Sequence, residues 1–220
     1  SLTGGNVSSS RIGKDIVEFN DKRYYITTKG NTAAGIEVYD ISGGDLATAF
    51  NTISPSTKVY TSAFNTNANA NLNGITHIET HVDNKNNEVH VLSGSTNNGF
   101  EFVKIPGNRS GLDFSSITSH FDLSGDNLPT ELGQTDAERG YSFNSTHVYV
   151  ADKGDTKVWY WDHSDQNSTA VSLDNGTGVI AGGTFQISDV VATDNGILAS
   201  NLSISAGNFR VYRWNDNSST

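Results

Sequence analysis

Short runs of β-branched and aromatic residues recur along the chain, separated by Asn, Asp, Ser and Gly. Helical periodicity is nearly absent, so these runs predict β-strands joined by turns. The strands are grouped in a regular way: a first strand, an Asn/Asp turn, a second strand, a Gly or Ser loop and a third strand. This group appears four times, in units near residues 15–63, 75–123, 138–173 and 187–214.

Two positions within the unit repeat together. The second strands begin at residues 23, 88, 147 and 196, the third strands begin at 35, 99, 157 and 208, and both spacings shorten along the chain. A repeat of about 40–60 residues with three or four antiparallel strands is typical of a β-propeller blade. The sequence therefore predicts an all-β fold, a β-propeller or partial propeller of about four blade-like antiparallel units. A β-sandwich built from the same hairpins is the alternative.

The end of the fourth unit differs from the ends of the others. The first three units are followed by segments that can supply an outer fourth strand, at residues 57–63, 114–123 and 170–173. After Trp214 there are only six polar residues. Because a bare strand edge is an aggregation risk, something is expected to cover it. Residues 1–14 are one candidate, which would make residues 1–220 a single β domain, and a strand from another copy is the other.

The last part of the chain carries a further set of short motifs. Within 141–162 and 185–216 these are Ile187-Ser188-Asp189, Asp194-Asn195-Gly196, Ser200-Asn201 and Tyr212-Arg213-Trp214. With these motifs the chain resembles a family of secreted bacterial β-propeller proteins of unknown function. The resemblance implies a propeller fold and an extracellular location, but it implies no chemistry. Members of that family usually have more than four blades.

The composition limits the cellular locations and the classes of binding partner that are expected for this chain. The net charge of −10 disfavours nucleic-acid and anionic-membrane binding, because phosphate contacts need clustered cations. The sequence contains no Cys and no Met, and it begins at Ser1. We therefore expect a processed or trimmed chain without disulfides or thiol chemistry, secreted or displayed on the surface of a bacterial cell. No apolar run approaches the ~20 residues that span a membrane as a helix, so no membrane insertion is expected.

One strand carries a possible metal-ligand set. His77, Glu79 and His81 alternate along the predicted strand, so their side chains share one face. Two His and one carboxylate form a known ligand set for zinc or iron. His90 lies on the next strand, beside His81 if the turn has four residues and facing away if it has five. The alternative is a hydrogen-bonded polar face, and we expect no cofactor, with calcium or a transition metal left open.

Aromatic residues on the third strands are the candidate ligand contacts. These are Trp159, Tyr160, Trp161 and Trp214, which could stack on a sugar or a protein partner, or pack between blades.

No catalytic residue is predicted, since neither a nucleophile motif nor a Cys is present. The sequence favours a non-enzymatic extracellular binding domain with a protein or glycan partner. A self-assembling subunit of an extracellular filament or surface layer is the first alternative. A glycan-active enzyme with a site in the propeller channel is the second.

Overall fold

The computed structural model describes residues 13–28, 36–43, 58–61, 76–95, 99–124, 139–152, 156–165, 167–176, 180–204 and 207–217. These residues form strands and turns, and none of them is helical. The chain divides into two compact units, residues 1–95 with 100–126 and residues 96–99 with 127–220. The single domain over residues 1–220 stays a prediction. Closure by residues 1–14 also stays one, since residues 1–12 lie outside the described ranges.

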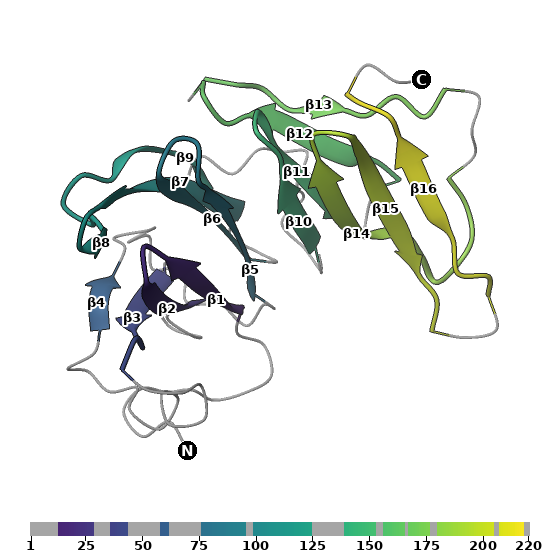
Figure 1. Cartoon of the computed structure of the whole chain (residues 1–220). Coiled ribbons are helices and arrows are strands. Elements are labelled where there is room, and N and C mark those ends of the chain that lie inside the picture. The colour runs from purple at the N-terminus through teal and green to yellow at the C-terminus, as the bar shows by residue number, and fades with distance from the viewer. Residues whose placement is uncertain are drawn as a thin grey trace. The chain divides into compact units, whose positions relative to one another are not determined.

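The first unit contains two antiparallel sheets, coloured purple to teal in Figure 1. One sheet has the strand order β1-β2-β3-β4 and the other has β5-β6-β7-β8, with β9 also paired to β7. The strands are β1 (Lys14–Phe19), β2 (Lys22–Thr28), β3 (Ile36–Asp40), β4 (Lys58–Thr61), β5 (Thr76–Asp83), β6 (Glu88–Ser95), β7 (Gly99–Asn108), β8 (Gly111–Leu112) and β9 (Thr118–Ser124).

The second unit also contains two antiparallel sheets, coloured green to yellow (Figure 1). Their orders are β10-β11-β12-β13 and β14-β15-β16. The strands are β10 (Arg139–Phe143), β11 (His147–Asp152), β12 (Val158–Asp162), β13 (Val171–Ser172), β14 (Phe185–Thr193), β15 (Gly196–Leu202) and β16 (Val211–Trp214).

Every sheet is built from strands that are consecutive in the sequence, as in a propeller blade. The outer strands predicted at 57–63, 114–123 and 170–173 are found as β4, β9 and β13. In the described part of the chain the fourth sheet has three strands, and no strand follows β16, as the sequence predicted. The all-β fold of four blade-like antiparallel sheets is therefore confirmed. No helix long and apolar enough to cross a membrane occurs among the described residues.

Local sequence sets the turns of the first hairpins. Asn20 and Asp21 join β1 to β2 and both have positive φ, 49° and 60°. Asn and Asp tolerate this conformation better than most residues, which suits a two-residue hairpin turn. A four-residue turn, 84–87, joins β5 to β6, because Asp83 pairs directly with Glu88. This register places His90 opposite His81, one of the two arrangements the sequence allowed.

Each unit has its own apolar core between its two sheets. In the first unit alternate residues of the strands, such as Val17 and Phe19 on β1, point into it. The buried members are Val17, Phe19, Tyr24, Ile26, Ile36, Val38, Ile78, Val89, Val91, Val103, Ile105 and Leu112. In the second unit they are Tyr149, Ala151, Val158, Leu173, Ile187, Val190, Ala192, Ile197, Ala199 and Trp214.

The first strands of neighbouring sheets approach each other closely at a glycine. A Cβ on Gly13 would lie 2.6 Å from the backbone of His77 and Ile78, and one on Gly140 would lie 2.5 Å from Cα of Asp189. Real Cβ contacts are essentially never that short, so each position requires glycine unless the backbone moves. Beside these contacts Thr80 Oγ1 donates to Asp15 Oδ2 (2.6 Å), and the Ala192 N–H donates to Ser142 Oγ (2.9 Å).

Candidate functional site

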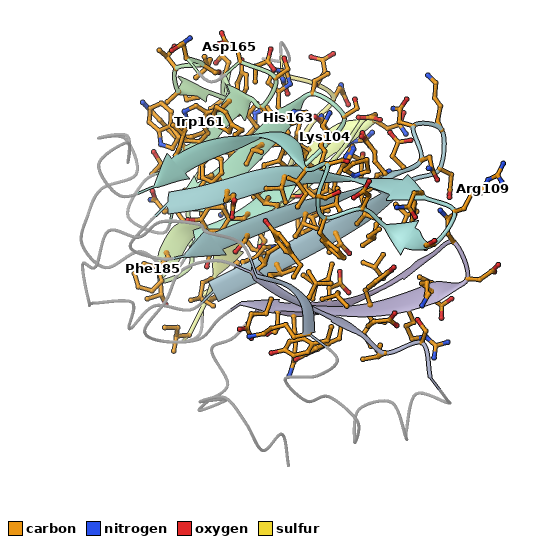
Figure 2. All side chains as sticks on the ribbon, turned by 90° about the vertical axis from the view of Figure 1, so that its left-hand side faces the viewer. Lys104, Arg109, Trp161, His163, Asp165 and Phe185 are labelled. Atoms are coloured by element: carbon orange, nitrogen blue, oxygen red, sulfur yellow. The ribbon has the colours of Figure 1, made fainter. Side chains whose placement is uncertain are left out.

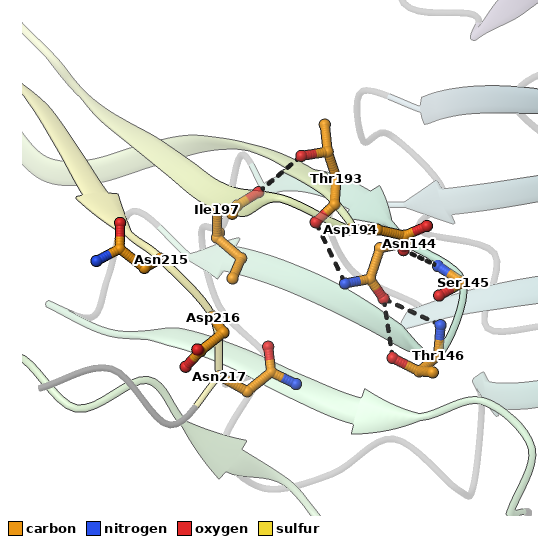
Figure 3. A pocket seen from close by; sticks show the side chains of 10 residues that line it. Asn144, Ser145, Thr146, Thr193, Asp194, Ile197, Asn215, Asp216 and Asn217 are labelled. Carbon is orange, nitrogen blue, oxygen red and sulfur yellow. Dashed lines mark hydrogen bonds between the residues drawn. The ribbon is translucent and has the colours of Figure 1, made fainter.

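A polar pocket of about 330 Å³ opens at the turns of the second unit (Figure 3). The β10–β11 turn, the β14–β15 turn and the segment after β16 form it. Its lining is Asn144, Ser145, Thr146, Thr193, Asp194, Gly196, Ile197, Asn215, Asp216 and Asn217. Ile197 is the one large apolar residue of this set. The pocket therefore offers amide, hydroxyl and carboxylate groups to a ligand.

Asn144 holds the first turn in shape. Its Oδ1 accepts hydrogen bonds from the backbone N–H groups of Thr146 (3.1 Å) and His147 (2.8 Å) and from Thr146 Oγ1 (3.2 Å). Its Nδ2 donates to Tyr149 Oη (3.1 Å) and, across to the second turn, to the Thr193 carbonyl (3.5 Å). An Asn at this place is favoured because its short amide can satisfy several backbone groups of one turn.

The other two walls are tied to the same turn. The Ser145 N–H donates to Asp194 Oδ1 (2.9 Å), which joins the β10–β11 and β14–β15 turns (Figure 3). Asn217, after β16, accepts a hydrogen bond from Tyr149 Oη at its Oδ1, and its Nδ2 lies 3.0 Å from His147 Nδ1. These bonds hold the pocket in shape before any ligand enters.

Burial keeps the groups beneath the pocket neutral. It lowers the pKa of His147 below its ordinary value, against the opposing charge of Asp162. It also raises the pKa of Tyr149 to about 12. The carboxyl groups of the lining belong to Asp194 and Asp216.

A hydroxyl next to an imidazole could suggest a nucleophile and its base. Thr146 Oγ1 lies 2.7 Å from His147 Nδ1. The same hydroxyl bonds Asn144 Oδ1 within the turn, and in the ranges that the structure describes no carboxylate hydrogen-bonds His147. The pair is thus part of the hydrogen-bond framework of the turn.

None of the four predicted aromatic contacts lines this pocket. Trp161 is 1% exposed, and Trp214 is 6% exposed with its Nε1 donating to the Asp174 carbonyl at 2.8 Å. Tyr160 is half-buried, and its ring packs edge-to-face with the His147 ring, with the ring centres 5.2 Å apart. Trp159 is half-buried, with Lys157 Nζ 4.8 Å from its ring centre. A binding role stays a prediction for all four, and Trp159 and Tyr160 keep more accessible surface.

The predicted metal ligands His77, Glu79 and His81 lie along β5, but they do not converge. Their partners on β6 are Gly94, Leu92 and His90 in turn. The His, Asp and Glu residues that do converge, within the described ranges, are Asp83, Glu88 and His90, whose ligand atoms all lie within 4.8 Å of one another. Only the position of His81 next to His90 links the two sets, and a metal role for the predicted set stays a prediction.

Sequence reasoning did not identify the pocket residues as a site. Asn144-Ser145 and residues 193–196 consist of residue types that turns favour, and this turn chemistry explains them without a ligand. The signal that could have suggested more was that both turns follow the first strand of a unit, which places them at the same end of neighbouring blades.

No protein-family model and no curated protein sequence matches this chain. Among solved structures it is similar to the Swd1 β-propeller domain of Myceliophteria thermophila, with 11% identity and a TM-score of 0.49. That alignment covers 94% of this chain and 52% of the other, so this chain spans about half the length of that domain.

A second similar structure is the α-L-arabinofuranosidase of Podospora anserina in complex with cellotriose, with 13% identity and a TM-score of 0.47. The alignment covers 98% of this chain and 68% of that one. Both likenesses concern the fold alone.

Proposed function

We propose that this chain is a non-enzymatic, extracellular binding domain that takes a neutral, hydroxyl-rich ligand, such as a short glycan, in the pocket of the second unit. The observation that carries the proposal is the lining of that pocket. Amide and hydroxyl groups can both donate and accept hydrogen bonds, as sugar hydroxyls require. The volume of about 330 Å³ lies at the lower end of the range for small-molecule sites.

The fixed turns support the same function. Binding is weakened when a ligand must order the groups that contact it. Here Asn144, Asp194 and Asn217 are held by hydrogen bonds to neighbouring turns. The acidic charge and the lack of Cys agree with an exposed bacterial surface protein that avoids nucleic acid.

The test is a titration of the full chain with a panel of neutral oligosaccharides, in which calorimetry and NMR measure the binding. For the glycan that binds, we expect Asn215→Ala and Asp216→Asn each to raise the dissociation constant about tenfold, the effect of losing one hydrogen bond to a charged or well-placed group. Asp21→Asn is the matched control, because Asp21 sits in the equivalent turn of the first unit and Asn also tolerates positive φ.

Failure of every neutral glycan to bind, or equal loss of affinity in Asp21→Asn, would overturn the proposal. Cleavage of a bound glycan would replace it with the alternative of a glycan-active enzyme.

A second candidate function is self-assembly, and the fourth sheet favours it. Val191, Leu198 and Val211 are 53%, 44% and 56% exposed on the face of this sheet that points away from the core of the unit. Phe209, just before β16, is 67% exposed. Exposed apolar side chains next to an edge strand are typical of a surface that pairs with another chain. Sedimentation over a range of concentrations tests this: Leu198→Ser with Val211→Thr should shift an oligomer toward monomer.

A further inference from the structure

Ligand atoms for a metal ion gather at the turn of the β5–β6 hairpin, in the first unit and apart from the polar pocket. Asp83 ends β5 and Glu88 begins β6, and the two are directly paired across the turn. His90 follows two residues later on the same face of β6. One ligand atom from each of these residues lies within 4.8 Å of the others.

His90 is positioned as a metal ligand would be. Its side chain is 6% exposed, and its ring packs edge-on against Phe102 with centres 5.6 Å apart. Its Nε2 points to Glu88, 2.7 Å from Oε1. Ligands of a tetrahedral ion lie about 3.3 Å apart when each is ~2.0 Å from the metal. An ion can therefore replace this hydrogen bond with a movement of about 0.6 Å.

His81 can complete the set from the opposite strand. It pairs with His90, and the two ring centres are 6.0 Å apart. Two imidazoles bound to one tetrahedral ion have centres about 5.1 Å apart, since each metal–nitrogen bond is ~2.0 Å and each ring centre lies ~1.1 Å beyond its nitrogen. The observed separation is about 0.9 Å wider, so the His81 ring has to move toward His90 to join the set. The resulting set has two imidazoles and two carboxylates.

We propose that Asp83, Glu88 and His90, completed by His81, bind a divalent transition-metal ion such as Zn²⁺ at the turn of the β5–β6 hairpin. Imidazole nitrogen with carboxylate oxygen suits zinc and its neighbours, whereas Ca²⁺ requires six to eight oxygen ligands. The ion joins β5 to β6 and stabilises the hairpin. Lys104 (Figure 2), whose charge acts on His90, opposes the ion and limits its affinity.

The experiment titrates the full chain with ZnCl₂, and separately with CaCl₂, by calorimetry and by thermal unfolding. We expect one Zn²⁺ per chain, a higher melting temperature with Zn²⁺, and no comparable effect of Ca²⁺. Asp83→Asn and Glu88→Gln should each weaken Zn²⁺ binding at least about tenfold. Loss of a hydrogen-bond partner of a metal ligand already weakens metal binding by about that factor, and loss of the ligand itself should weaken it at least as much. His81→Gln should weaken it as well.

Asp83→Asn is chosen because it keeps most of the turn's hydrogen bonds and loses only the one that Asp83 Oδ2 accepts from Asn86 Nδ2 (2.8 Å). Asn at position 83 can still accept the hydrogen bonds that Asp83 Oδ1 takes from the N–H groups of Lys85 and Asn86. His77→Gln and Glu79→Gln are the controls, on the same face of β5 but further from the turn. Zn²⁺ binding that is absent, or that is lost in these controls and kept in Asp83→Asn and Glu88→Gln, would overturn the proposal.

Discussion

Equivalent turns of the two units form pockets of nearly equal size whose polar groups are used differently. The pocket of the second unit has a volume of about 330 Å³, and a pocket of about 320 Å³ lies at the β1–β2 turn of the first unit. The latter is lined by Glu18, Phe19, Asn20, Asp21, Lys22, Arg23 and Ser42. Both lie where a first hairpin turn meets the end of a third strand, so the architecture is common to the two.

The difference lies in how the polar groups are used. In the first unit the charges pair with one another: Lys22 Nζ lies 2.9 Å from Asp40 Oδ2, and an Arg23 nitrogen lies 2.8 Å from Glu18 Oε1. In the second unit the lining consists mainly of amides and hydroxyls, which have more than one donor or acceptor. Paired charges stabilise a turn, whereas amides can hold a turn and still bind a ligand. The same scaffold thus supports one turn held by ion pairs and another whose amides are proposed to bind a ligand.

Among the substitutions that compare the two pockets, those of the buried residues beneath them are expected to have the largest effect on the free energy of unfolding. Trp214 precedes the wall formed by residues 215–217, and Ile41 occupies the corresponding place before Ser42. Trp214→Ala should lower the free energy of unfolding by about 3–5 kcal/mol and Ile41→Ala by about 2–5 kcal/mol, because both are buried. Urea denaturation measures both values.

Only the tryptophan variant should also impair glycan binding, because only its pocket is proposed to bind a glycan. If Trp214→Ala lost affinity while keeping its stability, the tryptophan would contact the ligand directly, as the sequence allowed. If Ile41→Ala lost as much affinity as Trp214→Ala, the distinction between the two pockets would fail.

A smaller effect distinguishes how each turn is held. Asn144→Ala should cost about 1–2 kcal/mol, because three hydrogen bonds to its Oδ1 are lost, and the cost should not depend on salt. Asp40→Ala removes bonds from Ser42 and Lys22 and should cost about 1 kcal/mol, less at high salt because part of that cost is ionic.

Denaturation in 0.05 M and 1 M NaCl measures the contrast, and Asn144→Asp, which keeps the acceptor oxygen, is the control. Equal salt dependence of Asn144→Ala and Asp40→Ala would contradict the assignment.

The sequence was sufficient for the strands because their pattern is local. Alternating apolar residues and Asn/Asp turns predicted all four units, and β4, β9 and β13 lie where outer strands were expected. The β5–β6 register depended on the length of one turn, which the residue pattern left open between four and five. That single residue decides whether His90 faces His81, so the cluster of Asp83, Glu88 and His90 could not be predicted.

The polar pocket could not be predicted from the sequence for another reason. Its walls come from turns near residues 144, 194 and 216, and no local pattern connects them. Each wall consists of residue types that turns favour anyway, so no single segment indicates a ligand. The burial of individual side chains could not be predicted either. Trp159 and Trp161 are two residues apart on β12, yet Trp161 is buried and Trp159 is only half-buried.

The smallest expected effect is the change in the free energy of unfolding that acid causes through titratable groups near the two pockets. Burial lowers the pKa of His147 below 6.5, against the charge of Asp162, so the unfolded chain takes up this proton first as the pH falls. Its contribution to stability is therefore complete above pH 6.5 and is lost as the pH falls below that value. Burial also lowers the pKa of His90, so this residue of the first unit adds to the same loss of stability.

Asp40 responds at lower pH. Burial opposes ionisation, but hydrogen bonds from Ser42 and Lys22 outweigh it and hold the pKa below 3.8. Its contribution is present above that value and is lost as the pH falls through the lowered pKa. Unfolding free energies measured from pH 7.5 to pH 3 should thus decline in two stages. His147→Gln should flatten part of the first stage and leave the second unchanged, whereas Asp40→Asn should do the reverse. A first stage that persists unchanged in the double variant His147→Gln with His90→Gln would show that other groups control it.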